Sequence, residues 1–127
     1  MGVVTGIESS MEKSKEFLRI YSMLIRAAQQ RGFVTDGDVA EVMGIACEGR
    51  RKSGSTARML ELISSRERRS GRPMLSAVVI SESSHKPLRT FHKAANNLGL
   101  LPSGLTKQQQ EAFWMAELER VFDEWSE

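Results

Sequence analysis

The fold of this chain is decided by the stretch from Arg31 to Ile80, whose first helix reads Thr35-Asp36-Gly37-Asp38-Val39-Ala40-Glu41-Val42-Met43-Gly44. Thr35 is a residue type that accepts hydrogen bonds from the free amides at a helix start, and the two aspartates after it favour the positive helix end. Apolar side chains then recur at helical spacing, and Gly44 can adopt the left-handed conformation that ends a helix. The sequence therefore predicts a short helix of about nine residues.

A polar segment from Cys47 to Gly54 follows this helix and has no apolar side chain except the cysteine. It contains two glycines and three consecutive cations, Arg50, Arg51 and Lys52. Such a composition is typical of an exposed loop. We expect this loop to occupy the place of the turn in a helix-turn-helix, although it is longer than the usual turn of about three or four residues.

A second helix is predicted to begin at Ser55 or Thr56, either of which can cap it, and to end at Gly71. Pro73 prevents the helix from restarting. The apolar stripe of this helix consists of Met59, Leu60 and Ile63, with Leu62 at its margin. The opposite side carries three cations, namely Arg58, Arg66 and Arg69.

The run from Pro73 to Ile80 is rich in β-branched and aliphatic residues, which predicts a buried strand. A polar turn from Ser81 to Pro87 follows. We expect Leu88 to Thr90 to be a return strand, so that the two strands form a small hairpin or wing. From Thr90 to Gly99 apolar residues again follow helical spacing. This order of elements is that of a winged helix-turn-helix.

Two longer helices are expected to flank this centre. Residues 1–8 are predicted to be a loose leader, and Ser9 with Glu12 fits a capping box that opens an amphipathic helix ending near Gly32. The last helix begins after Thr106, and its apolar face consists of Phe113, Trp114, Leu118, Val121, Phe122 and Trp125. This face is expected to clamp the first helix or the sheet. Alternatively, Phe113 and Trp114 form the interface of a homodimer.

At 127 residues the chain is most simply one domain spanning residues 1–127. Its longest apolar run, Met74 to Ile80, is too short to cross a bilayer. Residues 1–11 lack the basic-then-apolar pattern of a secretory signal. The single cysteine, Cys47, excludes an internal disulfide. Together these features predict a cytoplasmic protein.

Charge is distributed unevenly along the chain. Residues 50–72 contain eight cations and two carboxylates, a net charge of +6, whereas residues 111–127 contain six carboxylates and one arginine, a net charge of −5. A basic middle segment is suited to meeting phosphate groups. The alternative is that the basic segment and the acidic tail lie together and neutralise each other.

In helix-turn-helix proteins the second helix enters the major groove, where arginines read guanine or hold phosphate. The candidate nucleic-acid-binding residues are Arg50, Arg51, Lys52, Ser55, Thr56, Arg58, Arg66 and Arg69, with Lys86 and Arg89 as cations of the wing. The alternative is a solvated charged face that has no partner. If the face binds duplex DNA, Arg66→Ala combined with Arg69→Ala weakens binding and flattens its salt dependence.

No catalytic constellation stands out in the sequence. Cys47 has no base tied to it, because the only histidines, His85 and His92, are distant in sequence. No cysteine, histidine or carboxylate pattern has the spacing of a zinc site. A phosphate-cradling glycine loop and a dinucleotide fingerprint are also absent. We therefore expect a protein that is not an enzyme, with no metal and no cofactor.

Residues 34–79 resemble the winged-helix DNA-binding half of alkylguanine-DNA alkyltransferases and their alkyltransferase-like relatives. Thr35-Asp36-Gly37 matches the Thr-Tyr-Gly stretch that opens a short helix in that family, and Arg58 matches an arginine that enters the duplex as a base flips out. Pro73-Met74-Leu75-Ser76-Ala77 matches the Pro-Cys-His-Arg-Val segment. Because Met74 replaces the reactive cysteine, the resemblance implies the architecture and DNA binding but no alkyl transfer.

Residues 71–101 and 113–125 also resemble small uncharacterised bacterial proteins, often of mobile-element type, which implies no activity. We thus expect a mainly helical α+β fold, with a winged-helix-like centre and short hairpin flanked by long N- and C-terminal helices. The expected function is that of a non-catalytic nucleic-acid-binding module, with duplex DNA as the expected partner. The alternative function is protein interaction or homodimerisation through the aromatic last helix.

Overall fold

The computed structural model describes residues 14–44 and 49–126, with the side chains of residues 49–53 left undescribed. Within these ranges the chain forms five α-helices, one 3-10 helix and two short strands. In order they are α2 (Lys15–Gln29), β1 (Val34–Thr35), α3 (Asp36–Val42), α4 (Gly49–Arg69), the 3-10 helix η1 (Leu75–Val78), β2 (Val79–Ile80), α5 (Arg89–Asn97) and α6 (Lys107–Trp125). The expectation of a mainly helical α+β protein is confirmed.

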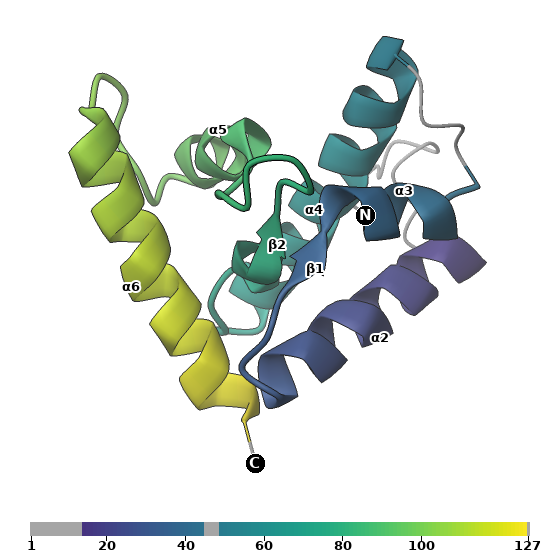
Figure 1. Ribbon diagram of the computed structural model, residues 1–127. Coiled ribbons are helices and arrows are strands. Elements are labelled where there is room, and N and C mark those ends of the chain that lie inside the picture. The colour runs from purple at the N-terminus through teal and green to yellow at the C-terminus, as the bar shows by residue number, and fades with distance from the viewer. Residues whose placement is uncertain (1–13, 45–48, 127) are drawn as a thin grey trace, which may run out of the picture.

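The two strands and η1 form the centre of the molecule. β1 and β2 pair in parallel, with Val34 opposite Val79. Figure 1 shows this small sheet between α6 on one side and α2 on the other. All four residues of η1 are buried, and η1 packs against α2, α4 and α6. The hydrophobic core therefore surrounds a segment that is itself neither a regular helix nor a long strand.

Helix α2 has the predicted apolar spacing but begins later than predicted, because Ser14 rather than Ser9 is its N-cap. The backbone amide of Phe17 donates to the Ser14 hydroxyl at 3.1 Å, which satisfies one of the free amides at the helix start. Phe17, Ile20, Leu24 and Ala28 are fully buried, as their helical spacing predicts. The predicted leader and the Ser9–Glu12 capping box lie outside the described residues.

The short helix α3 agrees closely with its prediction. Thr35 accepts a hydrogen bond from the Asp38 amide, and the Asp38 carboxylate accepts one from the Thr35 amide, each at 3.1 Å. Gly44 has a φ of +68°, the left-handed conformation that ends the helix. Because α3 begins directly after Thr35, β1 has room for only two residues.

The predicted loop from Cys47 to Gly54 is wrong from Gly49 onwards, since α4 begins there and the two residues before it are not described. Arginine and lysine are good helix formers, so a run of three cations extends a helix whose later turns are anchored in the core. The predicted caps are wrong for the same reason. Thr56 lies within α4 and is buried, and its hydroxyl contacts the Met43 sulfur at 3.9 Å.

The predicted strand from Pro73 to Ile80 is correct in its burial but wrong in most of its conformation. Residues 75–78 form η1, and only Val79 and Ile80 are in a strand. A strand needs a partner, and β1 offers just two residues. The 3-10 turn pairs backbone groups within the segment instead, since the Ala77 amide donates to the Met74 carbonyl oxygen at 3.1 Å. The Ser76 hydroxyl lies 2.7 Å from that of Ser64 in the interior.

The predicted return strand is also wrong, because α5 begins at Arg89 and Leu88 is its N-cap. One isolated antiparallel bridge joins Ile80 to Pro87. Pro87 has no backbone N–H to donate, which explains why the ladder does not continue. The turn between them is held by backbone hydrogen bonds from Ser81 to Lys86 and from His85 to Ser81, both 2.8 Å.

The aromatic face of α6 clamps the core, as its sequence predicts. α6 packs against η1 and α2, and Val121 and Phe122 are buried. A buried carboxylate adds to this contact, because Glu117 accepts a hydrogen bond from the Met74 amide at 2.8 Å. On its exposed side, Glu119 and Asp123 form ion pairs with Arg31, at 3.0 and 3.8 Å.

Candidate nucleic-acid interface

The arginines of α4 do not form one row. A helix turns by about 100° per residue, so Arg58 and Arg69 point within about 20° of each other, whereas Arg66 is rotated by about 80°. All three are exposed. The guanidinium of Arg66 lies 5.5 Å from the ring centre of Tyr21 and 6.0 Å from that of Phe17, so it covers the aromatic side chains of α2. Arg58 and Arg69 therefore lie closest together in direction, and Arg66 lies at the edge of the predicted face next to α2.

Arg72, which adds to the positive charge of this region, belongs to the core instead. Its guanidinium donates to both carboxylate oxygens of Glu67, at 2.7 and 3.1 Å, and Glu67 is fully buried. Hydrogen bonding to Glu67 raises the pKa of the Arg72 guanidinium, and the charge of Glu124 adds to this effect. The guanidinium also lies 5.5 Å from the Trp125 ring centre, which joins the ends of α4 and α6.

A groove of about 360 Å³ runs between α4 and α5. Its lining includes Arg58 and Glu61 from α4, and Thr90 and Lys93 from α5. The Glu61 carboxylate accepts a hydrogen bond from the Asn97 side chain at 3.4 Å. The groove thus brings a predicted contact residue, Arg58, beside a lysine that the sequence did not single out.

A larger cavity, of about 510 Å³, lies where the turn after β2 meets the starts of α5 and α6. We call it the α5–α6 cavity, and it is lined by His85, Lys86, Pro87, Arg89, His92, Lys107, Gln110, Glu111 and Trp114. Lys86 and Arg89, the predicted wing cations, therefore lie in one cavity with Lys107. The His92 ring nitrogen Nε2 lies 3.1 Å from the carbonyl oxygen of Gln110, which ties α5 to α6.

The groove and the cavity both border α5. Arg89 and Lys93 stand one turn apart on this helix, so their side chains share its exposed side. Together the two hollows define what we call the basic strip, which consists of Arg58, Lys93, Arg89, Lys86 and Lys107. Two carboxylates, Glu61 and Glu111, line the same hollows. Spacing alone does not reveal the strip, because its cations come from four segments.

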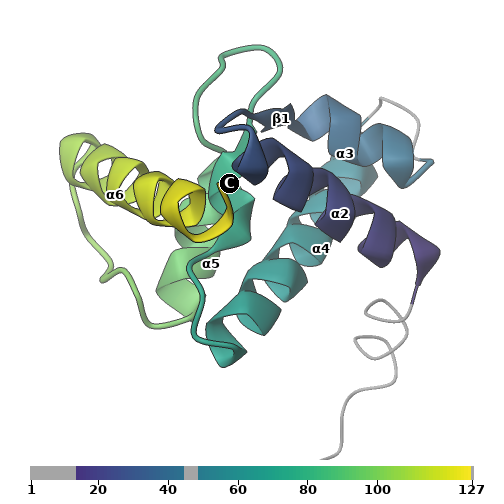
Figure 2. The ribbon, with the colours of Figure 1, turned by 90° about the horizontal axis from the view of Figure 1, so that it is seen from below.

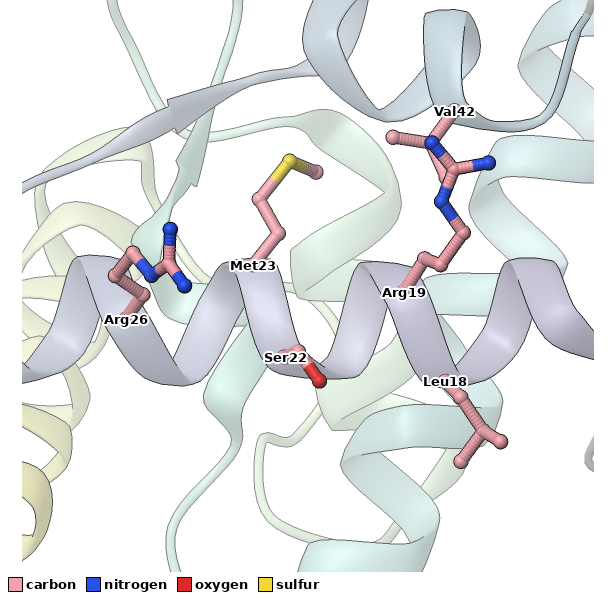
Figure 3. A pocket seen from close by; sticks show the side chains of 6 residues that line it. All are labelled: Leu18, Arg19, Ser22, Met23, Arg26 and Val42. Atoms are coloured by element: carbon pink, nitrogen blue, oxygen red, sulfur yellow. The ribbon is translucent and has the colours of Figure 1, made fainter.

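A third hollow, of about 430 Å³, lies on the other side of the molecule. Figure 3 shows Arg19 and Met23 rising from α2 toward Val42 of α3, with Arg26 further along the helix. In Figure 2, α4 lies between α2 and α5. Arg19 and Arg26 therefore form an exposed pair of cations remote from the basic strip.

The remaining predicted site residues have different surroundings. Arg50, Arg51 and Lys52 belong to the first turns of α4, and their side chains lie outside the described part. Ser55 is half-buried, and Thr56 is too deeply buried to reach a phosphate. Phe113 and Trp114 are half-buried within their own chain, where Phe113 contacts Phe91 and Trp114 stacks on Phe33.

Comparisons with protein-family models, with curated proteins and with solved structures found no match to this chain. In residues 14–44 and 49–126, no helix has the length and apolar character needed to cross a membrane. The same residues contain no group of three or more histidine, cysteine or carboxylate side chains arranged to hold a metal ion.

Proposed function

We propose that the protein is a non-catalytic, cytoplasmic module that binds nucleic acid, most simply duplex DNA, through the basic strip. The observation that supports this proposal is the convergence of five cations from four separate segments on two hollows that both border α5. All five side chains are exposed. In the described part of the chain, no carboxylate forms an ion pair with Lys86, Arg89, Lys93 or Lys107.

A surface of this kind gains its affinity from neutralising phosphates and releasing their counterions. Three carboxylates of the acidic tail are engaged elsewhere, because Glu119 and Asp123 pair with Arg31 and the buried Glu117 pairs with Arg120, whereas Glu111 lines the α5–α6 cavity. The charges of Lys86, Arg89, Lys93 and Lys107 outnumber the two carboxylates of the strip, so that a net positive charge is available to a polyanion.

We also propose that the centre of the fold is winged-helix-like. The order α2, β1, α3, α4 and then a turn with an antiparallel bridge supports this proposal. Figure 1 shows the first turns of α4 extending past α3, away from α6. On this basis α4 is the element that approaches the duplex, and the turn carrying Lys86 acts as a minimal wing beside it.

The test is a fluorescence anisotropy titration of a labelled random duplex with the Arg58→Ala, Lys93→Ala double variant. The logarithm of the binding constant falls linearly with the logarithm of the salt concentration, and each lost phosphate contact makes this slope shallower by about 0.9. At about 0.1 M salt, the loss of two contacts therefore lowers the binding constant by up to roughly sixtyfold. Both residues are exposed, so the variant is expected to remain folded, which circular dichroism checks.

The matched control is the Arg19→Ala, Arg26→Ala double variant. It removes the same charge from an exposed face on the other side of α4. The proposal predicts that the control retains most of its affinity. Equal losses in the two variants would show that binding depends on net charge alone, and no loss in either would show that the strip does not contact the duplex.

The second candidate function, homodimerisation through α6, is favoured by one observation. Met115 is 55% exposed on α6, and Phe33, which stacks on Trp114, is 47% exposed. Large exposed apolar side chains are typical of contact surfaces. We propose that Met115→Lys dissociates a dimer formed through this face. Light scattering tests this proposal by measuring the molar mass, because a protein that is monomeric before substitution has no such interface.

A further inference from the structure

The α5–α6 cavity places cations beside apolar side chains, a combination that backbone phosphate binding does not require. Its volume of about 510 Å³ is that of a small-molecule site. Its walls come from three segments: the turn containing His85 and Lys86, the start of α5, and the start of α6.

The walls of the cavity are held in place by hydrogen bonds. The backbone of Ser81 bonds to those of Lys86 and His85, at 2.8 Å in each case, and the His85 backbone adopts a left-handed φ of +61°. A non-glycine residue in that conformation is uncommon and needs such support. On the opposite wall, the Trp114 indole N–H donates to the Ala77 carbonyl oxygen at 2.9 Å. The cavity is therefore preformed.

The charge of the cavity selects an anion. Lys86, Arg89 and Lys107 line it with a single carboxylate, that of Glu111. Glu111 follows Lys107 by one turn of α6, an order that gives only a weak attraction between two exposed side chains. Two of the three cations therefore have no carboxylate beside them in the cavity lining, and a phosphate dianion supplies the missing charge.

The remaining lining suits a planar aromatic group. Trp114, His92 and Pro87 give the cavity an apolar wall beside its cationic one. The His92 ring is fixed by its contact with Gln110 and by an edge-to-face contact with Phe91, whose ring centre lies 5.3 Å away. Small-molecule sites combine apolar walls with a few oriented polar groups in this way.

From this combination we propose that the α5–α6 cavity binds the phosphate monoester of a nucleotide, with the phosphate among Lys86, Arg89 and Lys107 and the base against Trp114 and His92. Such a nucleotide is either free in solution or the 5′-phosphorylated end of a strand. The proposal rests on the proposed function and deepens it, because Lys86, Arg89 and Lys107 also belong to the basic strip. It specifies a terminal phosphate rather than the phosphates within a duplex.

The test is isothermal titration calorimetry of the full chain with adenosine monophosphate, adenosine, inorganic phosphate, and an oligonucleotide with or without a 5′-phosphate. We expect saturable binding of adenosine monophosphate with a dissociation constant below roughly 1 mM, and weaker binding of adenosine or phosphate alone. A 5′-phosphate that tightens oligonucleotide binding assigns the cavity to strand ends. Binding of the mononucleotide without such an effect assigns it to free nucleotides.

The variant Lys107→Gln tests whether the phosphate group binds in this cavity, and mononucleotide binding is measured apart from duplex binding because Lys107 also belongs to the basic strip. Loss of one charge-assisted contact is expected to weaken mononucleotide binding by about tenfold or more, whereas Arg19→Gln, the control, leaves it unchanged. Absence of binding by both the mononucleotide and the 5′-phosphate, or equal binding by Lys107→Gln, would overturn the proposal. Duplex affinity, measured separately with an internal stretch lacking terminal phosphates, would then still report on the basic strip.

Discussion

Replacing Arg72 with methionine tests whether this arginine holds the fold rather than a ligand. The substitution keeps an apolar stem beside Trp125 but removes the guanidinium that donates two hydrogen bonds to Glu67. Glu67 has an exposed fraction of 0%, so its carboxylate is left buried without a cation. Removal of one partner of a buried ion pair costs about 3–5 kcal/mol.

That loss is a large part of a typical unfolding free energy of about 5–15 kcal/mol. For a domain of this size it corresponds to a fall in melting temperature of roughly 10–20 °C. Urea denaturation followed by circular dichroism measures it as a lower midpoint with an unchanged slope. Because Arg72 lies outside the basic strip, duplex affinity of the folded variant is expected to stay close to that of the unaltered protein.

The double variant Glu67→Leu, Arg72→Met provides the control, since it removes the buried charge together with its partner. Replacing a whole buried ion pair by apolar residues is often neutral, so the double variant is expected to regain most of the lost stability. A single variant that loses less than about 1 kcal/mol, or a double variant no more stable than the single, would refute the reasoning.

Three further outcomes follow from contacts elsewhere in the fold. Glu117→Ala leaves the buried Met74 amide without its acceptor, so the free energy of unfolding measured by urea titration should fall by about 1–3 kcal/mol. A negligible change would show that this hydrogen bond does not hold α6 to the core. Gly71→Ala should cost about 1–2 kcal/mol through its φ of +78°, because open space surrounds the position and no clash contributes. Arg66→Ala removes the contacts with Phe17 and Tyr21, so the free energy of unfolding should fall by about 0.5–1 kcal/mol while duplex affinity stays nearly unchanged. A large loss of duplex affinity would show that Arg66 contacts the nucleic acid.

Local signals in the sequence were sufficient for several elements. The N-cap at Thr35, the helix-ending glycines at positions 44 and 71, and the apolar spacing of α2 all predicted what the structure contains. These features depend on neighbours within a few residues, so their physics is visible in the sequence. The aromatic face of α6 was likewise sufficient to predict that it covers the core.

Elements that depend on distant partners were predicted less well. The run from Pro73 to Ile80 has the composition of a strand, but β1 is too short to pair with it, and that limit is set by a helix that begins far earlier in the chain. The polar segment before Ser55 has the composition of a loop, yet it continues a helix whose stability comes from its later turns.

The candidate site shows the same contrast between features set by neighbours in the sequence and features set by distant partners. Counting charges identified the basic region of α4 but did not separate Arg72, which neutralises a buried carboxylate, from Arg58, which lines a groove. It also missed Lys93 and Lys107, because their relation to Arg58 and Lys86 arises only when α5 and α6 pack against the centre. The spacing of Arg89 and Lys93 on one helix was the single local signal available.

The salt dependence of duplex binding tests the proposed role of the basic strip most directly. If all five cations contact phosphates, the logarithm of the binding constant falls with the logarithm of salt concentration with a slope of about −4.5, and the Arg58→Ala, Lys93→Ala variant reduces that slope by about two. A slope near zero, or one that the double variant leaves unchanged, would contradict the assignment of the strip to nucleic acid.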